Sequence, residues 1–559
     1  MAKVNVKVKN RESLSDIFKG IASGVTGFFV FWILVIFPLY THDKYFDILS
    51  ARYMFFKVWT LSLILILIGL GIAYLFIDYN NNVSSPSAVE RLFLFFKIEN
   101  LKKNINLVDI FFVIMIISMT ISTFGSQFKE EAFYGSSGRF QGLECWILYF
   151  LTYIAISRTF KFKIFYLDFA LLAGCFACIW GTLDFFQLDP FGFFINVSGH
   201  QRGMFASSIG NLNTYTNYTI IIFALAATLF IIEKDFKKSI FYLITSIIGC
   251  AGSIYGLADN IVFGFIGFYV IVPFFCIKTR RHLLRYLITI DILLFSTFLF
   301  SKGLSLPHNT MQSSFFQDLV NKSSLIQYLF IPFTIIVVVS YFVMNKIKPN
   351  YENIIENNLT PLDSSLTKKI KVAYCVLIIV GIIFVTYVLV DVNILKINAD
   401  FWLNNIPSSH QLVFDDNWGT HRGHNWRIAF TNFTQNFNFF QKLFGYGPDT
   451  YLIVSERTFY DEMVSRYGEV YDSAHNEYIN YLICEGLIGL ISYLGILISS
   501  IRYAVKNMKN NPYIIACAMA VVAYAVQATV NIAIPITTPI YFALMFICVS
   551  EEVKAKSVV

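Results

Sequence analysis

The stretch YDSAHNEYINYLICEGLIGL, Tyr471–Leu490, passes from a polar segment directly into an apolar one. A His-Asn pair, His475 and Asn476, stands at the junction. An apolar run that begins where a long polar segment ends is typical of a membrane-spanning helix whose mouth meets water. The stretch therefore predicts a membrane fold. It also places the chain's best candidate for proton transfer at the membrane surface.

The composition of the whole chain agrees with this prediction. Of its 559 residues, 56% are hydrophobic and 14% are charged, which excludes a soluble domain. We expect an all-α polytopic membrane protein with about 14 transmembrane helices (12 to 14), each able to cross a ~30 Å hydrocarbon core. The expected spans begin near Ile21, Val58, Val108, Gly142, Ile164, Thr214, Ile240, Ile261, Leu287, Leu325, Val372, Glu477, Tyr513 and Pro535.

The spans divide the chain into five regions. Residues 1–20 form a basic N-terminus, and residues 21–391 hold the first 11 of the expected spans, including a polar linker at about 345–371. Residues 392–474 form a large helical loop, which should be an ordered cap. The last three spans follow in residues 475–550, and residues 551–559 form a short tail.

Lys and Arg are held back from translocation, so their distribution indicates orientation. With the N-terminus in the cytoplasm, the inner segments hold 29 of the 43 Lys and Arg residues and the outer segments hold 14. Both termini should therefore face the cytoplasm and the large loop should face outward. The net charge of +7 then reflects topology and contact with anionic lipids, because no basic region forms a nucleic-acid-binding domain.

The nine cysteines all fall within expected spans, where they serve as apolar filler, so neither a disulfide framework nor a zinc site is supported.

Two outward arginines lie in short loops close to the membrane: Arg139 in SSGRFQG and Arg202 in GHQRGMF. The planar guanidinium group donates two parallel hydrogen bonds to neighbouring phosphate oxygens and stays charged. Several such arginines at one interface would suit a lipid-linked diphosphate. Alternatively, each reaches toward headgroups or pairs with a loop carboxylate.

Several short motifs follow one another along the chain: Arg139 before a short span; Arg202, then Asn211-x-Asn213-x-Tyr215; Arg422 four residues before Trp426; Gly445-Tyr-Gly447; and Ala474-His475-Asn476, followed by Glu485-Gly486 and Gly489. In this order, over about 139–490, they resemble the O-antigen ligase and polymerase family of bacterial membrane glycosyltransferases. The chain departs from that pattern at Ala258-Asp259-Asn260, where many members look to have a Ser-Arg pair. Asp259 could instead bind an acceptor hydroxyl or pair with an arginine.

The resemblance implies an enzyme at the outer face of the bacterial cytoplasmic membrane. A glycan on a polyprenyl diphosphate, typically undecaprenyl diphosphate, would pass to an acceptor hydroxyl on a glycan or a lipid. The family implies no metal or other cofactor, and the sequence contains no outward Asp-x-Asp cluster of the kind that metal-dependent sugar transferases use. The choice between a ligase and a polymerase stays open, because both enzymes act on a lipid diphosphate donor and an acceptor hydroxyl with the same kind of general base.

Chemistry assigns roles to these residues. His475 is the expected general base, because an imidazole with an ordinary pKa near ~6.5 can take the acceptor proton near neutral pH. The leaving diphosphate needs its negative charge neutralised. We assign this role first to Arg202 and Arg422, then to Arg139, and last to Arg427. The alternative for His475 is a place in the first turn of a helix, completing a cap begun by Asp472 or Ser473.

Other residues are expected to bind substrate or acceptor, or to support the site. His475, Tyr478, Glu485 and Gly489 follow a helical spacing that would place them on one stripe of a continuous span, with Glu485 deep in the membrane, functional or locking the helix to its neighbours. The supporting set comprises Asn211, Asn213, Tyr215, Asp259, Asn476, Tyr478 and Glu485.

Two other classes of function stay open. A lipid-linked sugar transporter or flippase would need cationic residues in mid-span and two related halves, and neither is visible in the sequence. A peptidoglycan-type polymerase would need an essential outer carboxylate, for which Asp415, Asp416 and Asp449 are candidates.

Overall fold

The structure is a computed structural model that describes residues 13–81, 83–136, 138–308, 315–346, 364–406 and 409–557. The basic residues 1–12 and most of the expected linker, 347–363, lie outside these ranges. The described chain is helical apart from one small antiparallel hairpin, β1 (Phe205–Ala206) and β2 (Gly210–Asn211), in which Phe205 faces Asn211. The prediction of an all-α fold is confirmed.

Ten helical segments among the described residues are long and apolar enough to cross a membrane, and two further apolar helices are shorter. A membrane-embedded, many-helix architecture is thus supported, while the number of about 14 spans stays a prediction. These twelve lie at α1 (Leu14–Phe31, continued by π- and 3₁₀-helical turns to Leu39), α2 (Ile48–Asn81), α5 (Leu107–Gly125), α8 (Phe165–Phe185), α10 (Leu212–Ile232), α11 (Phe236–Tyr255), α12 (Ile261–Cys276), α13 (Arg280–Gly303), α16 (Phe330–Lys346), α17 (Ser364–Val390), α23 (Gly486–Asn507) and α24 (Ile514–Gln527). Two more helices pack in the bundle with them, α7 (Leu143–Thr159) and α25 (Thr538–Ser557).

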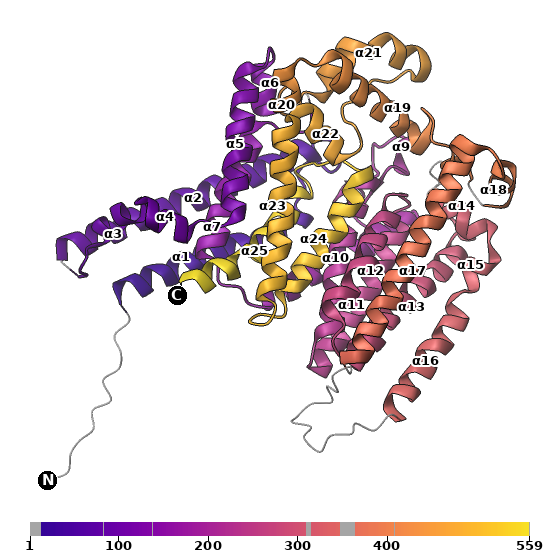
Figure 1. Ribbon diagram of the computed structural model, residues 1–559, viewed down its shortest axis with the longest axis horizontal. Coiled ribbons are helices and arrows are strands. Elements are labelled where there is room, and N and C mark those ends of the chain that lie inside the picture. Colours follow the sequence, from indigo (N-terminus) through magenta and orange to yellow (C-terminus); the bar gives the residue numbers. More distant parts are fainter. Residues whose placement is uncertain are drawn as a thin grey trace.

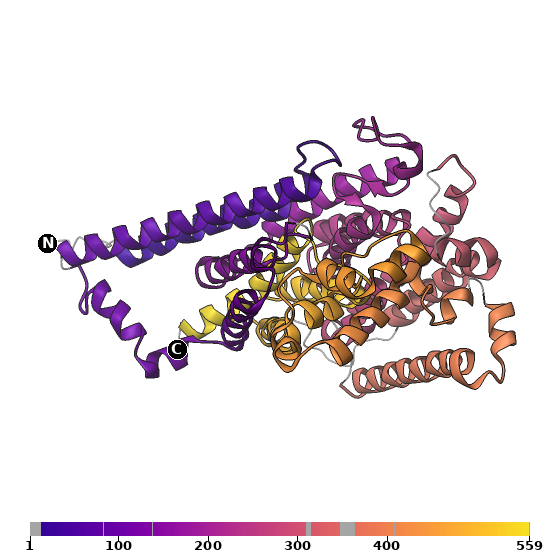
Figure 2. The same cartoon turned by 90° about the horizontal axis from the view of Figure 1, so that it is seen from above.

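Burial falls from the centre of the bundle to its edges. Nearly every residue of α10 is buried, as expected of a helix that is apolar all round and surrounded by other helices. α2 and α17 instead leave most of their apolar side chains exposed. Figure 2 shows these two helices at opposite edges of the bundle. Long aliphatic faces of this size suit contact with lipid rather than water.

Short helices with polar caps connect the long ones. Asn106 and Asp109 form a reciprocal capping box at the start of α5, and Asn438 and Gln441 form another at the start of α20. The connecting helices are α3 (Ala88–Phe95), α4 (Ile98–Asn104), α6 (Lys129–Tyr134), α9 (Gly199–Arg202), α14 (Phe315–Lys322) and α15 (Ser324–Tyr328).

The large loop before the final spans forms an ordered cap at one end of the bundle (Figure 1). In this cap α19 (Trp418–Thr431) continues as a π-helical turn over Asn432–Asn436, and the non-helical residues Phe437 and Asn438 separate it from α20 (Phe439–Phe444). The cap comprises α18 (Ala399–Asn405), α19 (Trp418–Thr431), α20 (Phe439–Phe444) and α21 (Tyr451–Tyr467), and α22 (Glu477–Cys484) leads from it back into the bundle.

Candidate active site

His475 lies in the turn that joins the cap to α22. Its φ is +49°, a left-handed conformation that is uncommon outside glycine. Asn476 is the N-cap of α22, since its Oδ1 accepts hydrogen bonds from the backbone N–H groups of Tyr478 and Ile479 at 3.0 and 3.1 Å. His475 therefore precedes the N-cap and does not lie in the first helical turn, which was the alternative considered for it. Because Asn476 performs the capping, the imidazole is not needed for it.

The helix after His475 is not continuous, which corrects the expected stripe. α22 ends at Cys484, Glu485 follows with φ −112°, and Gly486, the first residue of α23, has φ +71°. The break leaves the carbonyl groups at the end of α22 without hydrogen-bond donors from the helix. The Gly445-Tyr-Gly447 turn provides the donors instead: Tyr446 N–H donates to Ile483 O at 3.0 Å, and Gly447 N–H donates to Cys484 O at 3.1 Å. Two of the sequence motifs thus form one structural unit.

Both glycines of this unit are required by close backbone contact. A Cβ atom at Gly445 would overlap the Cys484 carbonyl, and one at Gly486 would overlap the Leu443 carbonyl. Each glycine also has positive φ, which other L-residues adopt at a cost. The turn therefore fixes the position of α22 and, through it, of the His475 turn.

Arg139 reaches the site from the loop before α7. Asp449, just after the Gly-Tyr-Gly turn, holds this loop by accepting hydrogen bonds from the backbone N–H groups of Arg139 and Gln141 at 2.7 and 2.9 Å. The Arg139 guanidinium then donates to Asp472, three residues before His475, at 2.8 Å. Burial raises the pKa of Asp449 to about 7 against the opposing effect of those two N–H groups.

Arg422 reaches the site from the cap. It follows a left-handed turn formed by Gly419, Thr420 and His421, whose φ values are about +60°. The guanidinium donates to the Gly419 carbonyl, and its buried Nε–H has no hydrogen-bond partner among the described residues. Burial lowers the pKa of Arg422, while the nearby Asp259 carboxylate acts in the opposite direction. Asp259 thus lies near an arginine, one of the two roles considered for it.

The pKa of His475 depends on both of these arginines and on Asp472. Burial lowers the pKa of His475 well below its usual range, and the charges of Arg422 and then Arg139 lower it further, while Asp472 raises it. Its Nδ1 lies 3.3 Å from the Ser473 hydroxyl. The imidazole is therefore neutral near pH 7, and two cations from different parts of the chain contribute to its low pKa.

A cavity of about 20 Å³, large enough for one water molecule, lies beside this group. Glu477 and Glu485 line it, and each has a buried Oε2 with no hydrogen-bond partner among the described residues. Glu477 also has its other oxygen 3.4 Å from the Tyr481 hydroxyl. Glu485 is 2% exposed and lines the same cavity as Asp449 and Asp472 of the cap. Its depth in a membrane stays a prediction.

Trp426 ties α19 to the His475 turn, because its indole N–H donates to the Ala474 carbonyl at 3.0 Å. Its ring lies 5.2 Å from that of Trp418 and 5.9 Å from that of Phe414, which is exposed. These three rings give the cap an aromatic surface close to the site, of the kind that stacks on sugar rings.

Two of the four candidate arginines lie elsewhere. Arg427 forms ion pairs in the cap with Asp416 and Glu462. Arg202 is exposed on α9, where its Nε donates to the Val197 carbonyl at 3.3 Å. Neither is among the main causes of the low pKa of His475.

The remaining supporting residues are held in structural contacts. Asn211 caps α10 by accepting from Asn213 N–H at 2.9 Å, and Tyr215 donates to the Cys178 carbonyl at 3.2 Å. Asn213 accepts from Asn531 through its carbonyl, at 3.0 Å, which ties α10 to the segment after α24. Tyr478 donates to the Ala525 carbonyl of α24 at 2.6 Å. These residues position the helices around the site.

One group of side chains in the cap has the composition of a metal site. The ligand atoms of Asp416, His424 and Glu462 lie within 4.8 Å of one another. The two carboxylates are also bonded to Arg427 and Arg466. A metal ion would compete with these two cations, so the group is better described as an ion-pair network that holds α19 to α21.

Sequence reasoning did not find the positioning role of Asp449, the ion pair of Asp472 with Arg139, or Glu477. The signals were local: Asp449 follows the Gly-Tyr-Gly turn by two residues, and Glu477 completes a His-Asn-Glu run. Only the fold shows which partners they meet.

Comparison of the sequence with models of known protein families gives no match, and comparison with curated protein sequences gives none either.

Proposed function

We propose that the protein is a metal-independent membrane glycosyltransferase that moves a glycan from a polyprenyl diphosphate to an acceptor hydroxyl in cell-surface polysaccharide assembly. One observation carries the proposal: a neutral His475 lies where the cap meets the membrane helices and feels the charges of Arg422 and Arg139. The motif order that resembles the O-antigen ligase and polymerase family supports the same reaction.

The two arginines suit a diphosphate. Arg422 and Arg139 each have a buried Nε–H that is free of a hydrogen-bond partner among the described residues. A phosphate oxygen would accept those hydrogen bonds and neutralise the two charges together. The leaving diphosphate is stable as an anion, so fixed cations serve it better than a proton donor.

His475 takes the acceptor proton in the proposed reaction. The acceptor oxygen forms a bond to the anomeric carbon as the bond from that carbon to the phosphate oxygen breaks, and the lipid diphosphate departs with the electron pair. The proton moves from the acceptor hydroxyl to His475. Bound diphosphate raises the pKa of His475, because it offsets the arginine charges that lower it. The base thus becomes stronger when the donor is in place.

The cap would face outward, both termini would face the cytoplasm, and the membrane would be the bacterial cytoplasmic membrane. This orientation rests on the two-to-one excess of Lys and Arg in the opposite loops. The exposed aromatic surface next to the site suits a glycan donor or acceptor.

The test is an assay of purified protein in liposomes with a polyprenyl-diphosphate glycan, with and without an acceptor. His475→Ala should lower the rate by about 10²-fold or more, because general-base catalysis is lost. His410→Ala, an exposed histidine of the same cap, is the matched control. Equal product from His475→Ala and wild type would overturn the mechanism. A ladder of lipid-linked products identifies a polymerase, and a single transfer identifies a ligase.

Two further arms use the same assay. Arg422→Lys should lower the rate roughly tenfold or more, because an ammonium cannot reproduce the guanidinium fork. Arg202→Lys should have the smaller effect, since Arg202 is exposed on α9 and is not one of the main causes of the low pKa of His475. A chelator should leave the rate unchanged. A requirement for a divalent ion would instead direct attention to Asp416, His424 and Glu462.

A further inference from the structure

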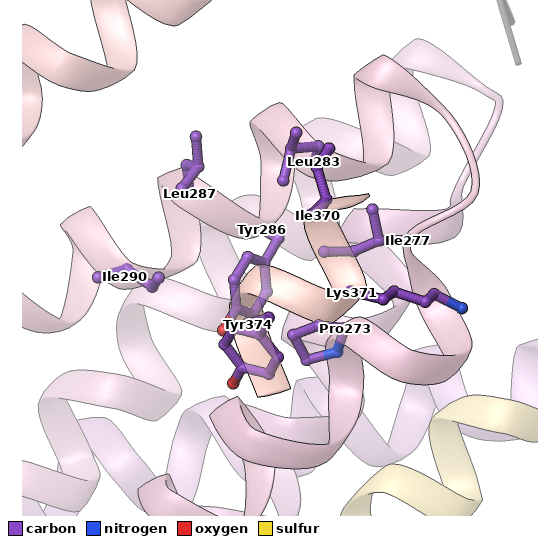
Figure 3. A pocket seen from close by; sticks show the side chains of 9 residues that line it. All are labelled: Pro273, Ile277, Leu283, Tyr286, Leu287, Ile290, Ile370, Lys371 and Tyr374. Atoms are coloured by element: carbon purple, nitrogen blue, oxygen red, sulfur yellow. The ribbon is translucent and has the colours of Figure 1, made fainter. Parts of the chain in front are cut away.

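A second and larger cavity, of about 250 Å³, lies between α12, α13 and α17. It is near the start of α17, at the end of the bundle away from the cap (Figures 1 and 3). Apolar side chains make up most of its wall. The lining residues are Pro273, Ile277, Leu283, Tyr286, Leu287, Ile290, Ile370, Lys371 and Tyr374.

The two tyrosines present rings rather than hydroxyl groups to the cavity. Tyr286 and Tyr374 both donate to the Tyr269 carbonyl, at 3.0 and 2.6 Å, so their hydroxyls are already used. Figure 3 shows the two rings side by side, with Lys371 extending away from them. An apolar cavity of ~150 Å³ stays dry and accepts apolar molecules. This larger one therefore suits a hydrocarbon chain.

The helix that forms one wall is itself exposed to the surroundings of the bundle. Along α17 the side chains of Val376, Leu377 and Val380 are exposed. In a membrane these aliphatic groups contact lipid chains, so a chain from the bilayer can reach the cavity beside α17 without crossing water.

Positive charge surrounds the same end of the cavity. Among the described residues the Lys371 ammonium donates to the Phe274 carbonyl at 2.9 Å, and an ammonium group has three N–H donors in all. Exposed Lys368 and Lys369 precede it on α17, and exposed Lys278 follows Ile277 of the lining. The sequence contains no Asp or Glu over 277–290 or 364–390. The complementary headgroup is a phosphodiester without a positive charge.

We propose that this cavity binds one acyl chain of an anionic phospholipid whose phosphate lies at Lys371. Two different properties of the site are needed for this recognition: the apolar volume holds the chain, and the lysines select the headgroup. The site does not depend on the reaction proposed above, because it lies at the other end of the helices.

Native mass spectrometry of the full-length protein in detergent tests the proposal, with phosphatidylglycerol or phosphatidylcholine of the same acyl chains added at equal concentration. The wild type should retain one phosphatidylglycerol about fivefold or more in preference to phosphatidylcholine. Lys371→Gln should reduce that preference about fivefold, whereas Lys302→Gln, on the far end of α13, should not. Equal retention of the two lipids by the wild type would overturn the proposal.

A second pair of variants tests the cavity itself. Ile290→Trp fills it and should abolish retention of the single phosphatidylglycerol. Leu299→Trp, the same substitution at an exposed position on α13, should leave retention unchanged. Phosphatidylglycerol should also raise the unfolding temperature of the wild type more than that of Lys371→Gln. Retention by Ile290→Trp at the wild-type level would contradict the assigned place.

Discussion

The Nη2 atom of Arg139 donates a hydrogen bond to the Oδ1 atom of Asp472 over 2.8 Å. The pair joins the loop before α7 to the turn before α22. Both partners act on His475, since Arg139 lowers its pKa and Asp472 raises it. Burial and Arg422 lower that pKa more than Arg139 does, so the ion pair adjusts it further through two opposing charges. An incoming diphosphate must compete with Asp472 for Arg139.

Removing the charge of Asp472 should change substrate binding and the catalytic rate in opposite ways. Asp472→Asn removes the competing charge, so KM for the lipid diphosphate should fall by roughly threefold to tenfold. The same change removes a group that raises the pKa of His475, so kcat should fall as well. Steady-state kinetics in liposomes measure both. Asp461→Asn, an exposed carboxylate on α21, is the control, and an increase in KM for Asp472→Asn would contradict the prediction.

Asp449 should control stability in a pH-dependent way. Its pKa is about 7 in the folded protein and about 3.9 in an unfolded chain. The folded state therefore keeps a proton that the unfolded state loses. The stabilisation is complete below pH ~4 and is lost as pH rises through 7. Asp449→Asn mimics the neutral acid, so its unfolding temperature relative to the wild type should increase from pH 5 to pH 8.

Asp449→Ala distinguishes this titration from the role of the carboxyl as an acceptor. Without an oxygen to accept from Arg139 and Gln141, the loop before α7 loses its anchor. The alanine variant should be less stable than the wild type at every pH and less active, while the asparagine variant keeps activity near pH 6. A pH-independent difference between Asp449→Asn and the wild type would rule out the assigned pKa.

The sequence predicted the class of fold well, because long apolar runs and scarce charge permit few alternatives to a helical membrane protein. The apolar runs coincide with helices along most of the described chain, down to the division between α11 and α12 near Tyr255–Asn260. Periodicity failed at Glu485 and Gly486. A helical spacing continues through that point in the sequence, but the chain breaks there because a distant turn supplies hydrogen bonds to the freed carbonyls.

The candidate site was predictable only in part. His475 could be chosen from its residue type and its place at the membrane mouth. The sequence ranked Arg422 above Arg427, although they lie five residues apart on one short helix, but it gave no partner for either of them. Local carboxylates decide between them: Asp416 and Glu462 pair with Arg427 in the cap, while Arg422 remains close to His475. Such partners become visible only when the helices are packed.

Gly445 should be more sensitive to substitution than Gly468, another glycine with positive φ, because Gly445 combines a close backbone contact with a φ of +83° and a ψ of −179°, whereas Gly468 is in the left-handed helical region. Gly445→Ala places a methyl group on the Cys484 carbonyl and also adopts an unfavourable positive φ. Gly468 has φ +66°, and a methyl group there would have no neighbouring atom within 4 Å, so Gly468→Ala carries only the conformational cost of about 1 kcal/mol. Gly445→Ala should unfold at a clearly lower temperature and lose activity. Equal unfolding temperatures for the two variants would show that the contact at Cys484 is unimportant.

The pH dependence of the rate tests His475 most directly. In the free protein its pKa lies below the ordinary ~6.5, so kcat/KM should fall only in the acid range below that value. Bound diphosphate offsets Arg422 and Arg139, so the fall in kcat should occur at higher pH, by about one unit or more. Arg422→Gln should move the acid limb of kcat/KM upward, because it removes one cause of the low pKa, while Arg427→Gln in the cap network should leave that limb in place. Identical acid limbs for kcat and kcat/KM in the wild type would mean that the diphosphate does not activate the base.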